Sequence, residues 1–119
     1  MTLKAYHFHF INGPQANQSS LQGFDMSLVY AAFEYQTAIY LSHDGVFHLL
    51  DKDATTGFIR DFQHQLLDWE MFELSGVYVD EKSLDNRGIS KDTLPNAVTV
   101  LPHSEFCAQL LNATLVYNF

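Results

Sequence analysis

The chain has 119 residues and a formal net charge of −8, because 14 acidic residues outnumber 6 basic ones. This length predicts one domain, residues 1–119, and the 47% hydrophobic and 14% aromatic content is ample for a packed core. The excess of acidic residues argues against direct nucleic-acid binding. No stretch approaches the roughly 20 apolar residues of a membrane span. We therefore expect neither a nucleic acid nor a membrane as a direct partner.

Strand and helix patterns alternate along the chain. In chain order, the predicted elements are a strand at Leu3–Ile11, a helix from Ser19 or Ser20 to about Glu34, a strand at Thr37–Ser42, a turn at Asp44-Gly45, a long helix from Phe58 to Leu74, a strand at Gly76–Val79, a short helix at Ser83–Arg87 closed by Gly88, a strand at Ala97–Leu101, a helix from Pro102 to about Leu111 and a strand at Thr114–Phe119. This alternation predicts an α/β fold: a single three-layer domain with a mostly parallel five-stranded sheet.

The segment Thr37–Leu50, TAIYLSHDGVFHLL, is the most informative stretch. A buried strand that ends at a glycine turn is how α/β proteins build the rim where ligands and partners bind. This rim has no cysteine, no serine in a glycine-flanked elbow and no glycine-rich phosphate loop. We therefore predict a binding or interface role for it, with a plain turn as the alternative.

The predicted long helix has more apolar surface than one domain can bury. Phe58, Phe62, Leu66 and Trp69 form one stripe, and further apolar residues widen it. The helix therefore has two apolar faces, and one domain can bury only one of them. We expect a partner chain to cover the other face. Together with the rim, this helix supplies the residues that we predict at a subunit interface: His43, Asp44, Val46, Phe47, His48 and Trp69.

Cys107 is the only cysteine, so an intrachain disulfide is excluded. A lone thiol without a secretory signal pattern is typical of the reducing cytoplasm, where we expect this protein. His103 lies four residues earlier on the same predicted helix, and the two side chains therefore share a face. A nucleophilic thiol is one interpretation, and simple packing of Cys107 between Phe106 and Leu110 is the other.

Other candidate groups carry less specific signals. His7 and His9 point to one face of their strand and could hold a metal, but hydrogen-bonded structural histidines are the commoner outcome. The acidic residues are typical of a solvated surface, although closely spaced carboxylates can also divide acid and base roles. Nucleotide-binding, zinc-protease and nucleophile-elbow motifs are absent. We predict no catalytic residue, no cofactor and no metal.

Four groups of residues resemble one family. They are Gly23-Phe24-Asp25, Asp44 to Leu50 (DGVFHLL), Ser83-Leu84 with Arg87-Gly88, and Val116 to Phe119 (VYNF). Together with the order of elements, they resemble the TusC/DsrF branch of the DsrE/DsrF-like sulfur-relay family over essentially the whole chain. The DGVF-x-LL stretch followed by S-L-x-x-RG is the most specific part.

The resemblance implies a flavodoxin-like or DsrEF-like fold. It also implies a heterohexamer with TusB/DsrH-like and TusD/DsrE-like subunits, or a homo-oligomer when the chain is alone. The implied function is support of persulfide transfer for 2-thiolation of the tRNA wobble uridine. The alternatives are a DsrF-like role in sulfur oxidation, an independent small-molecule-binding protein that uses the His43–Leu50 rim, and a homo-oligomer with another partner.

One position departs from the family pattern. In the TusD/DsrE-like subunit, the relay cysteine lies eight residues before the glycine of the Arg-Gly pair, and counting back from Gly88 gives Asp80. A carboxylate cannot form a persulfide, and Cys107 does not match this position. The resemblance therefore implies an accessory, non-enzymatic subunit that does not itself carry sulfur.

Overall fold

The computed structural model describes residues 4–13, 19–50, 74–94 and 98–119. Its strands are β1 (Ala5–Phe10), β2 (Gln36–Leu41), β3 (Gly76–Asp80), β4 (Thr99–Leu101) and β5 (Leu115–Asn118). Its helices are α1 (Ser19–Ala32), α3 (Glu81–Asn86), α4 (His103–Leu111) and the 3₁₀ helices η1 (His43–Leu49) and η2 (Lys91–Thr93). Apart from Leu74, the predicted long helix that contains Trp69 lies outside the described residues.

The five strands form one sheet in the order β4-β3-β2-β1-β5, and every neighbouring pair is parallel. Ile39 at the centre pairs with Phe8 on one side and with Val77 on the other. The predicted α/β class and five-stranded sheet are therefore confirmed, and the sheet is parallel throughout. Because all strands run the same way, their carboxyl ends lie along one edge.

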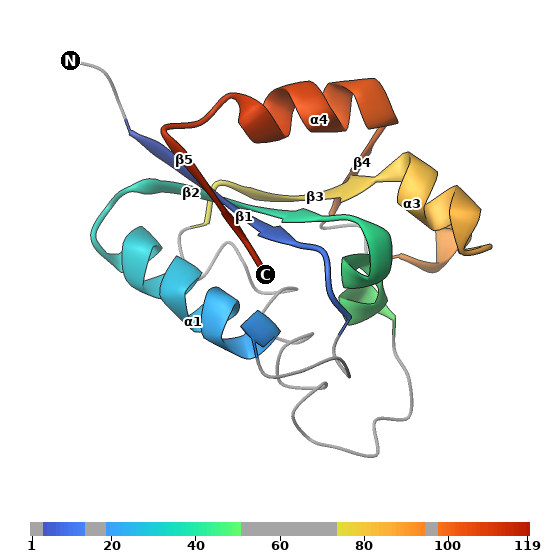
Figure 1. The fold of residues 1–119 in the computed structure, drawn as a ribbon, viewed down its shortest axis with the longest axis horizontal. Coiled ribbons are helices and arrows are strands. Elements are labelled where there is room, and N and C mark those ends of the chain that lie inside the picture. Colours follow the sequence, from blue (N-terminus) through green and yellow to red (C-terminus); the bar gives the residue numbers. More distant parts are fainter. Residues whose placement is uncertain (1–3, 14–18, 51–73, 95–97) are drawn as a thin grey trace.

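Alternate residues of each strand serve two separate cores. On one face, Phe8, Ile39 and Val77 belong to a buried cluster with Phe24 of α1. On the other face, Tyr40 packs in a smaller cluster with residues of α4. Figure 1 shows the layers, with α1 below the sheet and α4 above it. This is the predicted arrangement of helices on both faces.

The segment after β2 is a 3₁₀ helix, η1, rather than a tight turn followed by an apolar run. Gly45 explains why the chain can fold so closely here. Its N–H donates to the carbonyl of Ile11 at 3.0 Å, and a Cβ at this position would lie 1.9 Å from the carbonyl oxygen of Phe10. Only glycine fits such a close backbone approach.

The short helix after β3 begins at Glu81, two residues earlier than predicted, and its closing glycine is confirmed. Gly88 has a φ of 65°, the left-handed conformation that glycine adopts without strain. The N–H of Ile89 then donates to the carbonyl of Leu84 at 3.0 Å. This ending returns the chain toward β4.

Among the residues that the structure describes, large apolar side chains are exposed in two places. Val29, Phe33 and Tyr35 lie at and just after the end of α1, and Phe33 is 72% exposed. Leu111 and Leu115 lie at the end of α4 and the start of β5. Within the described ranges, we find no helix with the length and apolar character needed to span a bilayer.

Candidate functional site at the carboxyl edge of the sheet

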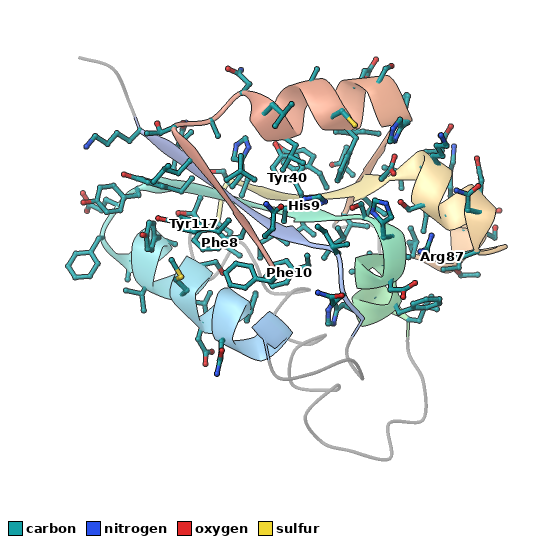
Figure 2. All side chains as sticks on the ribbon, viewed as in Figure 1. Phe8, His9, Phe10, Tyr40, Arg87 and Tyr117 are labelled. Carbon is teal, nitrogen blue, oxygen red and sulfur yellow. The ribbon has the colours of Figure 1, made fainter. Side chains whose placement is uncertain are left out.

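Polar side chains end four neighbouring strands at the same edge of the sheet. Asn118 lies in β5, His9 in β1 and Asp80 in β3, while Ser42 directly follows β2. In parallel α/β sheets, ligands bind beyond this edge. Figure 2 shows His9 here, whereas Phe8 and Phe10 point to the α1 side. The carboxyl edge is therefore the candidate functional site.

Three of these strand ends are joined by direct hydrogen bonds. His9 Nδ1 lies 2.9 Å from Asn118 Oδ1, and His9 Nε2 lies 2.6 Å from Ser42 Oγ. Ser42 Oγ also lies 3.0 Å from His43 Nδ1. Burial lowers the pKa of His9, so its ring is neutral at pH 7 and has one donor and one acceptor. His9 therefore donates to Asn118 and accepts from Ser42, which leaves Ser42 to accept from His43.

A second set of hydrogen bonds holds Asp80, a residue that is 2% exposed. The Ser83 hydroxyl donates to Asp80 Oδ2 at 2.7 Å and accepts from the backbone N–H of His43 at 2.8 Å. His103 Nδ1 donates to the carboxylate at 3.1 and 3.2 Å. A buried carboxylate is costly unless donors compensate it, and these two side chains supply them.

Cys107 lies beside His103, as their spacing on one helix predicts. The distance from Cys107 Sγ to His103 Nε2 is 3.6 Å. The thiol is partly buried and also packs against the cluster that contains Phe106 and Leu110. Both features predicted for Cys107, the contact with His103 and the packing, are therefore present. The sequence did not predict that Asp80 also contacts His103, on the side of the ring opposite Cys107.

The two most specific family motifs meet in space. Arg87 donates to Asp44 Oδ1 from Nε at 3.0 Å and from Nη2 at 2.9 Å. Arg87 Nη1 also donates to the carbonyl of Ser83 at 3.3 Å. The DGVF stretch on η1 and the S-L-x-x-RG stretch around α3 thus hold each other in place.

The predicted interface residues differ in accessibility. His43 and Asp44 are exposed and Phe47 is half-buried, so these three can meet a partner. Val46 and His48 are 0% and 1% exposed, which corrects their assignment to a contact surface: η1 turns both side chains into the protein. Trp69 lies outside the described residues.

His43 has one further unusual feature. Its φ of 52° is uncommon for a residue with a side chain and costs about 1 kcal/mol or more. This conformation directs the chain from β2 into η1, where the backbone N–H of His43 reaches Ser83. The strain lies at the start of the rim, and backbone strain of this kind is common at functional sites.

His7 and His9 share one face of β1, as predicted, but they have separate structural partners. Burial lowers the pKa of His7, and its Nδ1 donates to the carbonyl of Leu110 at 2.7 Å. Both ring nitrogens of His9 are already engaged. Within the described part of the chain, no group of three histidine, cysteine or acidic residues is placed to hold a metal ion. The contacts of both residues match the structural-histidine interpretation.

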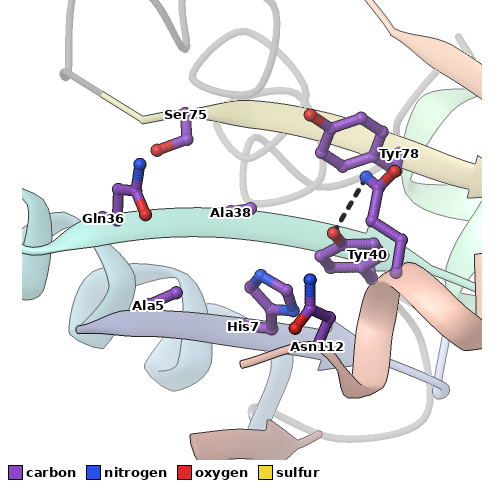
Figure 3. Close-up of a pocket in the computed structure, with 9 residues that line it drawn as sticks. Ala5, His7, Gln36, Ala38, Tyr40, Ser75, Tyr78 and Asn112 are labelled. Carbon is purple, nitrogen blue, oxygen red and sulfur yellow. Dashed lines mark hydrogen bonds between the residues drawn. The ribbon is translucent and has the colours of Figure 1, made fainter. Parts of the chain in front are cut away.

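A cavity of about 220 Å³ opens at the opposite, amino edge of the sheet (Figure 3). Ala5, Gln36 and Ser75 line it near the strand starts, and His7, Tyr40 and Tyr78 line it from the strands. Gln109 Nε2 donates to the Tyr40 hydroxyl at 3.0 Å, and burial raises the pKa of Tyr40 to about 12. This cavity could not be predicted from the sequence, because its residues come from four separate segments of the chain.

These features define a class: an all-parallel α/β protein with a connected polar edge at the carboxyl ends of its strands. The chain belongs to the DsrE/DsrF-like family, whose model matches residues 4–117. It is 24% identical over 111 residues to a protein named TusC homolog from Vibrio vulnificus strain CMCP6, an alignment that covers 92% of this chain and 94% of the relative.

The chain is also similar to two further proteins. The chain is 26% identical over 88 residues to a TusC homolog from Aliivibrio fischeri strain ES114, covering 73% of this chain and 75% of the relative. The crystal structure of the ychN protein from E. coli superimposes with a TM-score of 0.78 at 19% identity, and the match covers 98% of this chain and all of that one. This last similarity shows the fold alone.

Proposed function

We propose that this chain is an accessory subunit of a sulfur-relay complex. The family membership and the similarity to TusC homologs along most of the chain support this role. The complex passes persulfide sulfur toward 2-thiouridine at the tRNA wobble position and works in the cytoplasm. Its other members are TusB/DsrH-like and TusD/DsrE-like subunits in a heterohexamer. The net charge of −8 leaves contact with the tRNA to a partner.

The observation that carries the accessory role is the state of Asp80. This residue stands at the position that the family resemblance equates with the relay cysteine, and it is a buried, hydrogen-bonded carboxylate. A carboxylate has no sulfur to form a persulfide. The relay step at this position is therefore the work of the TusD/DsrE-like subunit.

The exposed part of the rim supplies the contact surface of this role. His43, Asp44 and Phe47 are the accessible members, and Arg87 fixes Asp44 from the side of α3. Hydrogen bonds hold this rim in one conformation before any partner arrives, which reduces the entropy lost on binding.

The test is a tagged full-length chain purified from its host. Co-purification with TusB-like and TusD-like chains, and loss of 2-thiouridine from tRNA after deletion of the gene, are the expected results. Normal thiolation with impaired oxidation of stored sulfur would favour the DsrF-like alternative. A stable monomer that ignores both partners and holds a metabolite would contradict the proposal in favour of an independent binder.

A further inference from the structure

Asp80, His103 and Cys107 form a hydrogen-bonded row from the end of β3 to the first turns of α4. We propose that this row is a thiol site that accepts sulfane sulfur from a persulfide. The substrate class rests on the proposed sulfur-relay function. The site itself goes beyond that function, because it places a sulfur-accepting thiol in a chain whose relay position holds a carboxylate.

The direction of the hydrogen bonds follows from the chemistry of the three groups. A carboxylate only accepts, so the Nδ1 of His103 carries the proton and donates it to Asp80. In the neutral ring, Nε2 then has a free electron pair, and it lies 3.6 Å from Cys107 Sγ. The imidazole is thus in the correct tautomer to take the thiol proton.

The row is held from both ends. Asp80 is buried and receives a second hydrogen bond from Ser83, so the carboxylate is fixed before it orients His103. His103 and Cys107 lie one turn apart on α4. A nucleophile, a base and a group that orients the base are the parts that activated nucleophiles share.

The arrangement suits sulfur transfer better than acyl transfer. Acyl transfer also needs donors that stabilise an oxyanion. Exchange between sulfur atoms needs a thiolate to attack and a proton for the thiolate that leaves. One imidazole beside one thiol meets both needs. Cys107 is partly exposed and the His103 side chain is 48% exposed, so a persulfide can approach from solvent.

The transfer step is balanced without an oxidant or a reductant. The Cys107 thiol gives its proton to His103 Nε2, and the thiolate attacks the terminal sulfur of a persulfide R–S–SH. A bond forms between Sγ and that sulfur while the S–S bond of the donor breaks. The leaving thiolate keeps the electron pair of the broken bond and takes the proton from the imidazolium. The products are the Cys107 persulfide and the thiol R–SH.

This site revises one expectation from the sequence. The prediction that the chain carries no sulfur assumes that Asp80, at the relay position, and Cys107 do not belong to one site. In the folded chain, a single imidazole joins the two positions. The carboxylate at the relay position would then serve as the positioning residue for a thiol supplied by α4.

The experiment uses the full-length chain with two probes, iodoacetamide for the thiolate and glutathione persulfide for sulfur transfer, both at neutral pH and read by mass spectrometry. Cys107→Ser, which has no thiol, measures the background labelling by both probes. His103→Ala removes the base, and Glu105→Ala is its control because Glu105 is an exposed residue in the same first turn of α4. Asp80→Asn tests the positioning residue, and thermal melting checks that each variant is folded.

We expect glutathione persulfide to add one sulfur atom to Cys107. His103→Ala should slow both reactions about tenfold or more, with part of the rate restored by free imidazole, whereas Glu105→Ala should leave both rates within about twofold of wild type. Asp80→Asn should slow both reactions without lowering the rate to that of Cys107→Ser. Protection of Cys107 until the protein unfolds, or equal rates in His103→Ala and wild type, would overturn the proposal even if Asp80→Asn fails to fold.

The inference and the proposed function fail in different ways. An unlabelled Cys107 in a chain that still co-purifies with its partners removes the thiol site and leaves the accessory role intact. A labelled Cys107 in a chain that binds neither partner and is not needed for thiolation keeps the reactive thiol. That second result removes the sulfur-relay role and, with it, the persulfide as the substrate in the cell.

Discussion

Arg87 donates two hydrogen bonds to one carboxylate oxygen of Asp44, at 3.0 and 2.9 Å, across 43 residues of sequence. The Asp44 side chain is 63% exposed and that of Arg87 is 23% exposed, so solvent reaches the carboxylate and the pair contributes little to stability. Its structural effect is to fix the rim of η1 against α3.

The first prediction concerns this pair. Asp44→Asn and Arg87→Ala should each lower the free energy of unfolding by no more than about 1 kcal/mol, because solvent screens the charges. Each should nevertheless weaken co-purification with partner subunits, since the rim loses its fixed conformation. The ion pair of Lys91 with Glu81 offers a control away from the rim, and Lys91→Ala should leave assembly unchanged. Full assembly of Asp44→Asn would show that the rim is not the interface.

Gly45 provides a prediction about stability. In Gly45→Ala, the new Cβ would lie 1.9 Å from the carbonyl oxygen of Phe10, so backbone must move and we expect a loss of about 3 kcal/mol or more. Gly88→Ala is the matched comparison, because Gly88 has a φ of 65° but open space around it. That variant should lose only about 1 kcal/mol. Urea denaturation measures both losses, and equal values would contradict the explanation.

The buried His48 should make the stability of the fold depend on pH. Burial lowers its pKa from 6.5 to about 4, although its Nε2 donates to the carbonyl of Asn12 at 3.0 Å. Between pH 6.5 and 4 the unfolded chain therefore binds more protons than the folded one. The stabilisation is complete above pH 6.5 and is lost as the pH falls toward 4, by about 3 kcal/mol in total.

Urea denaturation at several pH values between 4 and 7 tests this dependence. His48→Gln keeps a donor for the Asn12 carbonyl but has no titrating group, so its stability should fall less steeply with acid. The slope should not vanish, because burial lowers the pKa of His7 and His9 in the same direction. Identical slopes for wild type and His48→Gln would assign the acid sensitivity to other groups.

Phe47 tests the interface directly. It is a half-buried apolar residue of the rim, between the buried Val46 and His48. Phe47→Asp should split the assembly, because a charge at a contact surface remains desolvated and unpaired, while the isolated chain stays folded. Size-exclusion chromatography and circular dichroism measure the two effects. Loss of the native fold would instead make Phe47 part of the core.

Much of the architecture was predictable from the sequence. Runs such as Gln36–Leu41, with their β-branched and aromatic residues, and the helical spacing around His103–Leu111 identify strands and helices because these patterns depend on local periodicity. The shared face of His103 and Cys107 follows from the same rule. The left-handed conformation of Gly88 was predictable, because the residue that ends a helix often adopts this conformation and glycine does so without strain.

The tertiary structure decided which of these residues act together. Pairing of parallel strands brings Asn118, His9 and Ser42 into contact, although Asn118 and His9 are 109 residues apart. The approach of α4 to the end of β3 places Asp80 against His103, a contact that depends on the distance between two layers and not on any spacing along the chain. Periodicity describes one element at a time, whereas the polar edge and the Asp80–His103–Cys107 row arise where several elements end.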